Sequence, residues 1–222
     1  MNVFFMEVRN LRKSALVSTL SIGGAIFAML AFFPAMQTES MQALAGAKLE
    51  GIDPSLLAAL GLRELVDFSV ITNFFGYLLQ FIALAVMVVV TQQAVGLLIK
   101  EETGGTIEYL CAKPVSRLEI FSQKGLAHVV IFFVSSAIWA AVTMAGYLLF
   151  SEYTFGEAAA EAVTFFSAIF FIGMVFSAVG VLLSTLLKNG RATAGITVAI
   201  VFGSFILGIM SATIGGLDFL KW

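Results

Sequence analysis

The side chains best able to do chemistry lie in one polar stretch, residues 100–120, which has the sequence KEETGGTIEYLCAKPVSRLEI and separates two long apolar segments. It holds the only cysteine, Cys111, and a single thiol cannot form a disulfide within the chain. The sequence has no cluster of zinc ligands and no G-x-x-x-x-G-K-[ST] phosphate loop. We therefore expect no ATP hydrolysis and no bound cofactor in this chain, and the stretch is a candidate for binding rather than catalysis.

Start and stop signals in this stretch predict a short helix between two breaks. Thr106 can cap a helix whose first turn contains Glu108, where a negative charge is favourable. Pro114 disfavours helix at the residue before it and ends the element. Ser116 and Glu119 then match the S-x-x-E capping box, which predicts the start of the next long helix.

The short helix has an apolar ridge, because Ile107, Leu110 and Cys111 fall at i, i+3 and i+4 with Tyr109 beside them. Such a ridge in a polar loop is shaped to dock into a groove on another protein. A turn that rests on the bilayer surface is the alternative interpretation.

Composition places the whole chain in a membrane. The chain has 222 residues, of which 60% are hydrophobic and only 12% are charged, and 22 are Phe. A soluble fold would have too little polar surface, so we predict an all-α integral membrane protein built as one helix bundle. The net charge of −2 argues against a nucleic-acid partner.

Charge-free intervals longer than about 20 residues predict five membrane-spanning helices within one transmembrane domain, residues 1–222. The predicted spans are residues 14–36, 68–99, 125–151, 162–187 and 192–217. Residues 1–13 predict an interfacial elbow helix, and its apolar residues at helical spacing are Phe4, Phe5, Val8 and Leu11. An ordinary basic flank of the first span is the alternative. Residues 100–124 form the loop between the second and third spans.

Lys and Arg set the orientation. With the N-terminus inside, the inner segments hold nine of these residues and the outer segments hold three, namely Lys48, Arg63 and Lys221. The N-terminus and residues 100–124 are therefore predicted to be cytoplasmic. Five spans leave Trp222 outside, and the aromatic and Lys ending is typical of an interface before another crossing, so we expect a sixth helix beyond it.

Polar and small residues inside the spans have modest predicted roles. Asn73 and Gln80 share a helix face and could line a pathway or bond a neighbouring helix. His128 is expected to be an interfacial polar residue. Small residues four apart in the fifth span predict close packing inside the bundle, and a role in the interface between subunits is the alternative. They are Gly195, Ala199 and Gly203 in one row, and Ser204, Gly208, Ala212 and Gly216 in another.

The outer loop, residues 37–67, predicts one short helix on the outer leaflet. Asp53 is a candidate N-cap, Pro54 suits the first helical position and Gly61 suits the end.

The polar stretch resembles the cytoplasmic-loop signature of ABC-2 type transporter permeases. The matching residues are Glu102, Gly105, Thr106, Glu108, Leu110, Pro114, Ser116 and Arg117. Tyr109 and Cys111 stand where aliphatic residues are more usual in the family. The order of segments is also similar along the whole chain.

The resemblance implies that transport and ATP hydrolysis are carried out by different subunits. Permeases of this family have no ATPase domain, usually have six spans, and pair as dimers, here expected to be homodimers. They recruit two separate ATP-binding cassette ATPase subunits, which bind ATP and Mg. The signature loop forms the coupling helix in a groove of the ATPase, and the elbow helix touches the same subunit.

The main hypothesis is the permease subunit of an ATP-driven exporter in a bacterial cell membrane. A hydrophobic or amphipathic substrate, such as a peptide, suits a Phe-rich bundle whose predicted spans hold no Asp, Glu, Lys or Arg. The alternative is an immunity or regulatory membrane protein that binds such a substrate without transporting it. An enzyme embedded in the membrane is disfavoured, because no His, Asp, Glu and Ser constellation converges in the sequence.

Overall fold

The computed structural model describes residues 3–38, 68–103, 116–186 and 192–213, and most of these residues are helical. The long helices are α1 (Val3–Ala31), α5 (Ile71–Thr103), α7 (Arg117–Phe150), α8 (Phe155–Leu186) and α9 (Thr193–Thr213), with a short α2 (Phe33–Met36) after α1. All five long helices are long and apolar enough to cross a membrane. The predicted fold class, an all-α bundle with five spans, is confirmed.

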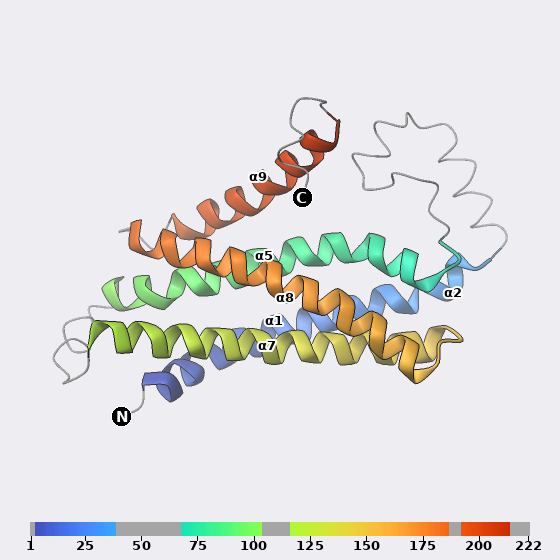
Figure 1. Cartoon of the computed structure of the whole chain (residues 1–222), viewed down its shortest axis with the longest axis horizontal. Helices are drawn as coiled ribbons and strands as arrows, with labels where there is room; N and C mark the ends of the chain where they lie inside the picture. Colours follow the sequence, from blue (N-terminus) through green and yellow to red (C-terminus); the bar gives the residue numbers. More distant parts are fainter. Residues whose placement is uncertain (1–2, 39–67, 104–115, 187–191, 214–222) are drawn as a thin grey trace.

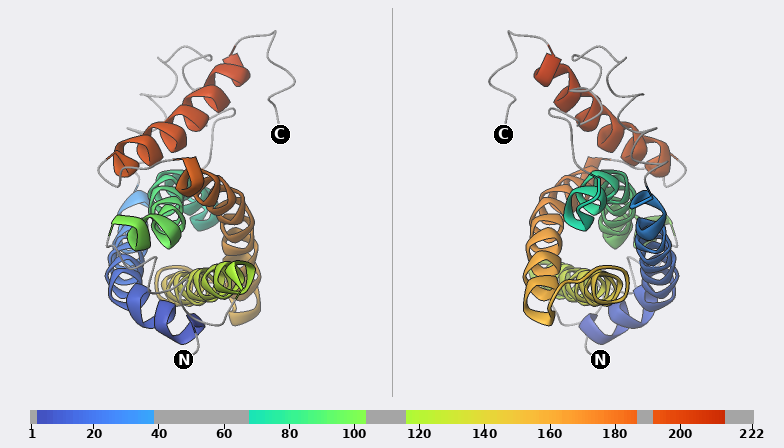
Figure 2. Two further views of the ribbon diagram at one scale, coloured as in Figure 1. Left: turned by 90° about the vertical axis from the view of Figure 1, so that its left-hand side faces the viewer. Right: turned by 90° about the vertical axis from the view of Figure 1, so that its right-hand side faces the viewer.

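Four of the helices form a bundle and the fifth lies beside it. Seen along the bundle axis, α1, α5, α8 and α7 surround a common centre, while α9 crosses obliquely outside them (Figures 1 and 2). The most extensive contacts join α1 to α7 and α5 to α8, followed by α7 to α8. Helix α9 packs chiefly on α5.

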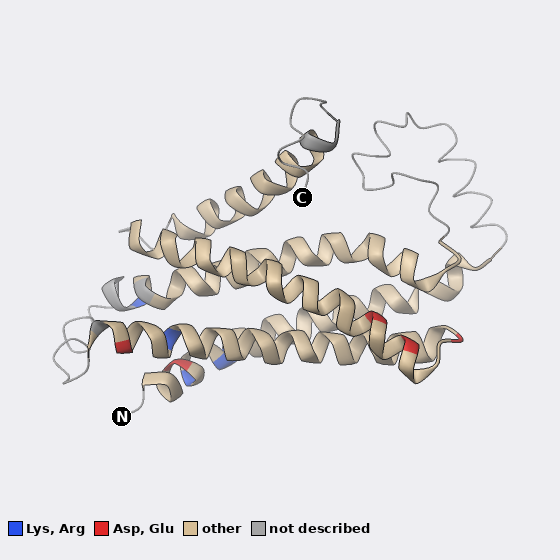
Figure 3. Cartoon of the chain, in the orientation of Figure 1, with Lys and Arg blue, Asp and Glu red and all other residues tan. Residues whose placement is uncertain are grey.

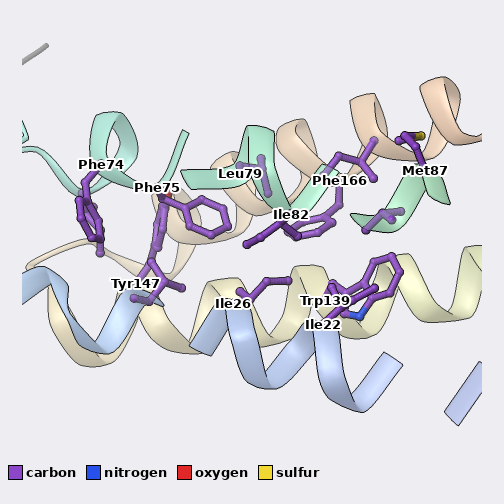
Figure 4. Packing of buried hydrophobic residues seen from close by; sticks show 14 of the residues in the cluster. Ile22, Ile26, Phe74, Phe75, Leu79, Ile82, Met87, Trp139, Tyr147 and Phe166 are labelled. Carbon is purple, nitrogen blue, oxygen red and sulfur yellow. The ribbon is translucent and has the colours of Figure 1, made fainter. Parts of the chain in front are cut away.

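The centre of the bundle is filled by aromatic and aliphatic side chains from all four helices (Figure 4). Phe75 of α5 packs edge-on against Tyr147 of α7, with ring centroids 5.8 Å apart. Ile26 of α1 and Phe166 of α8 belong to the same cluster. Tight packing of this kind holds membrane helices together, since lipid is as apolar as the side chains and gives little hydrophobic driving force between helices.

Helix α1 runs without a break through residue 13, where the sequence predicted a boundary between the elbow helix and the first span. It ends at Ala31 because Pro34, early in α2, has no N–H and its ring cannot fit into the preceding helical turn. The interfacial placement of the first turns of α1 stays a prediction.

Two later helices begin earlier than the charge-free intervals indicated. Helix α7 begins at Arg117, where Ser116 caps it by accepting a hydrogen bond from the N–H of Glu119 at 3.1 Å. This part of the predicted capping box is confirmed. Residues 117–124, which precede the charge-free interval of the third span, are helical, as the capping box predicted.

Helix α8 begins at Phe155, although the span was predicted from residue 162. Thr154 and Glu157 form a reciprocal capping box. The hydroxyl and N–H of Thr154 donate to Glu157 Oε2 at 2.7 and 2.9 Å, and the N–H of Glu157 donates back to Thr154 Oγ1 at 3.4 Å. A helix can extend beyond its charge-free interval when a cap pairs the free N–H groups of its first turn. A prediction based on charge alone therefore places the start of α8 too late.

Small residues at close helix contacts lie elsewhere than predicted. On α9 the residues Gly195 and Ala199 are exposed, and a Cβ added at Gly195 or Gly203 would meet no atom within 4 Å. The predicted packing of this row inside the bundle is therefore wrong. The close approaches occur at glycines in the bundle itself. At Gly180 the atom met belongs to the backbone, because an added Cβ would lie 2.7 Å from the carbonyl oxygen of Thr91.

The predicted helix at Asp53–Gly61 lies outside the described residues.

Candidate functional site

One end of the bundle collects the basic side chains. In the part of the chain that the structure describes, Lys and Arg gather in the first turns of α1, the last turn of α5 and the first turns of α7 (Figure 3). We call this the basic end. The helix ends that flank residues 104–115, the end of α5 at Thr103 and the start of α7 at Arg117, both lie here.

A buried ion pair joins three helices at the basic end. Lys124 Nζ of α7 lies 3.2 Å from Glu7 Oε2 of α1, and the two side chains are only 2% and 3% exposed. The same ammonium donates a hydrogen bond to the carbonyl oxygen of Leu97 on α5 at 2.9 Å. Buried charges are tolerated only when they are paired and hydrogen-bonded, and this ammonium has both kinds of partner.

The first turn of α1 is fixed to α7 by further contacts. The N–H of Phe4 donates to Gln123 Oε1 at 3.2 Å. This bond satisfies one of the N–H groups that a helix leaves without a partner in its first turn. Val3 and Ile120 pack together as a small separate apolar cluster. The beginning of α1 is therefore attached to the first turns of α7 by an ion pair, a hydrogen bond and an apolar contact.

The buried face of α1 explains how Glu7 comes to lie there. Val3, Glu7, Leu11 and Ala15 are four apart and all buried, so they form one row along the helix. Of the residues predicted to form the apolar face of the elbow helix, Leu11 is buried, Phe4 and Val8 are half-buried, and Phe5 is exposed. Of the four residues of the predicted apolar face, only Leu11 is on the buried face of α1.

Most of the predicted coupling-helix residues lie outside the described residues. These are Gly105, Thr106, Ile107, Glu108, Tyr109, Leu110, Cys111 and Pro114. Glu102 lies in the last turn of α5, Ser116 caps α7, and Arg117 is its first helical residue.

Polar contacts inside the bundle tie α7 to both of its neighbours. His128 Nε2 lies 3.0 Å from the hydroxyl of Ser177 on α8, and both residues are buried. The hydroxyls of Thr19 on α1 and Ser135 on α7 are 2.8 Å apart, and Trp139 Nε1 donates to the Thr19 carbonyl at 3.0 Å. The expectation that His128 lies near the membrane interface stays a prediction, and the structure adds that its side chain is buried between α7 and α8.

The other predicted polar residues are more peripheral. Asn73 is exposed and Gln80 is half-buried, and each has a polar partner. Their role in a pathway or in helix packing stays a prediction.

The opposite end of the bundle carries carboxylates (Figure 3), and a hollow lies there as well. The hollow has a volume of about 930 Å³, and Glu152, Glu157 and Glu161 line part of it. The carboxylate of Glu157 also serves as the cap partner of Thr154. The carboxylates give this mouth a negative potential, which favours cations over anions there.

The sequence interpretation missed the importance of Glu7 and Lys124. Glu7 lies within the predicted elbow helix, and Lys124 is one of the nine inner Lys and Arg residues on which the predicted orientation rests. The available signal was the i+4 spacing of Glu7 between Val3 and Leu11, which places a carboxylate within an apolar row. Within the residues that the structure describes, no group of three or more His, Cys, Asp or Glu could hold a metal ion.

Five long apolar helices, four of them packed as a bundle with the fifth beside it, define a polytopic membrane protein. Residues 1–219 match the family described as ABC-2 family transporter protein, and the chain belongs to this family. Neither the curated proteins nor the solved structures gave a match. The chain is thus an ABC-2 transporter permease with several membrane-spanning helices, a class that typically has no ATPase activity of its own and generally pairs with ATPase subunits.

Proposed function

We propose that this chain is the membrane-spanning subunit of an ATP-driven exporter in a bacterial cell membrane. It acts as a dimer, with a homodimer as the expected arrangement, and two separate ATP-binding cassette subunits bind ATP and Mg. The family match over residues 1–219 is the observation that carries this proposal.

The proposed route of coupling runs through residues 104–115. Movement of the ATPase subunits pushes on the apolar ridge of Ile107, Leu110 and Cys111, and the push tilts α5 and α7. The position of this segment between those two long helices supports the proposal, because any displacement of the segment acts directly on both.

The proposed substrate is hydrophobic or amphipathic, such as a peptide. The core cluster of the bundle is aromatic and aliphatic, and the buried ion pair lies at the basic end rather than in the middle of the bundle. A charged cargo would require compensating charges along its path. The excess of Lys and Arg at the basic end supports a cytoplasmic location for this end and for the N-terminus.

The substitution Leu110→Asp tests the coupling role. A charge facing an apolar groove costs several kcal/mol unless it is paired, so we expect normal membrane insertion but loss of the co-purifying ATPase or of its stimulated turnover. The control is Leu118→Asp, because Leu118 is 76% exposed in the first turn of α7, where a negative charge is favourable.

Wild-type yield and turnover of the ATPase with Leu110→Asp would refute the docking ridge. If the wild-type chain binds an amphipathic peptide but no ATPase co-purifies with it, the immunity or regulatory alternative is supported instead.

A further inference from the structure

The Glu7–Lys124 ion pair is almost completely removed from solvent. It joins the first turns of α1 to α7, while the Leu97 carbonyl brings in α5. Leu97 and Lys124 each lie about two turns from the helix end that flanks residues 104–115. All three helices therefore meet at one ammonium group, close to the segment proposed to receive the push.

A buried ion pair contributes little to stability, since the loss of hydration of both ions offsets most of their attraction. A buried ion pair differs from an apolar contact chiefly in what happens when the two helices separate. When the helices part and water enters, both ions regain their hydration, whereas an apolar seam would expose its surface to water without compensation. A charged junction can therefore open into water more readily than an apolar junction of the same size.

We propose that Glu7, Lys124 and the Leu97 carbonyl form a latch. The latch holds the basic ends of α1, α5 and α7 together in the state seen here, and it opens to water when α5 and α7 are displaced. The inference rests on the proposed function for the source of that displacement, but the latch itself is defined by residues of this chain.

The reporter for the latch is a thiol at Ala127, which lies one turn beyond Lys124 and is 0% exposed. Cys111 is replaced by Ala, so that Ala127→Cys supplies the single thiol. The full chain is purified with its ATPase partner in lipid nanodiscs. The rate of maleimide labelling is measured without nucleotide, with ATP and Mg, and with a non-hydrolysable ATP analogue. In the wild-type background we expect the rate to differ by about tenfold between nucleotide states.

Two variants of the latch move the labelling rate in opposite directions. Glu7→Gln removes the negative charge beside the buried ammonium, so labelling without nucleotide rises by about tenfold. The double variant Glu7→Leu with Lys124→Met replaces the ion pair by an apolar pair of similar size. It unfolds at a temperature no lower than wild type, yet labels slowly in every nucleotide state. The matched control is Glu119→Gln, the same change at an exposed carboxylate of the same end, which leaves the rate unchanged.

A purely structural ion pair predicts a different outcome. In that case the stable apolar double variant responds to nucleotide as wild type does, and this result overturns the latch. Absence of any nucleotide response in a wild-type complex with an active ATPase also overturns it. If no ATPase co-purifies with the wild type, the proposed function fails instead. The comparison of Glu7→Gln with wild type on the chain alone then decides whether the pair keeps this end closed.

Discussion

The close contact of α5 and α8 at Gly180 gives a sharp prediction about stability. At Gly180 of α8, an added Cβ would lie 2.7 Å from the carbonyl oxygen of Thr91 and 2.9 Å from Ala94 Cβ, both on α5. The first distance is about 0.7 Å short of an ordinary van der Waals contact of 3.4 Å. The atom that it meets belongs to the backbone of a long helix, so side-chain rotation cannot relieve the clash. Gly180→Ala must push α5 and α8 apart along one of the most extensive contacts of the bundle.

Overpacking of this kind typically costs about 1–3 kcal/mol. Alanine also has a higher helix propensity than glycine, by up to about 1 kcal/mol in water, and this gain has to be separated from the clash. Gly203→Ala on α9 provides the control, because its added Cβ would meet no atom within 4 Å. Both substitutions share the propensity gain, so the difference between them isolates the clash. We expect Gly180→Ala to be about 1–3 kcal/mol less stable than Gly203→Ala.

The measurement is the free energy of unfolding in mixed micelles titrated with a denaturing detergent, followed by circular dichroism and by tryptophan fluorescence. Coincident transitions by the two probes are needed before a free energy is assigned. Equal stability of the two variants within about 0.5 kcal/mol would refute the close approach of α5 and α8 at Gly180.

Two further predictions concern the buried histidine and the orientation. His128→Leu removes the bond to Ser177. In a double-mutant cycle with Ser177→Ala, measured by the same unfolding assay, we expect a coupling free energy of about 0.5–2 kcal/mol. A coupling free energy of zero would contradict the contact. Residues 100–124 are predicted to be cytoplasmic, and Cys111 is the only native thiol. It should therefore react with a membrane-impermeant maleimide in inside-out vesicles stripped of the ATPase and stay unlabelled in intact cells. Labelling from outside intact cells would show that the predicted orientation is wrong.

Hydropathy alone was sufficient to predict the class of protein and its five long helices, because the cost of placing charge in hydrocarbon is large and depends little on tertiary contacts. Local capping chemistry was equally readable at Ser116, whose hydroxyl accepts the N–H of Glu119 as predicted. The T-x-x-E pattern at Thr154 and Glu157 carries the same information for α8, whereas the charge-free interval places the start of that helix at residue 162. Signals of this type lie within a few residues of one another, so a single sequence contains them in full.

The partners of individual side chains were decided only by the tertiary structure. Nothing near Glu7 in the sequence indicates Lys124, since the two residues meet only because α1 lies along α7 with a particular rotation about its axis. The same holds for His128 and Ser177 across α7 and α8. Glycines show most clearly what the sequence cannot predict. Gly195 and Gly203 on α9 have open space around them, whereas Gly180 on α8 lies against α5. Spacing along a helix defines which residues share a face, whereas the neighbour that covers that face is set by how whole helices pack.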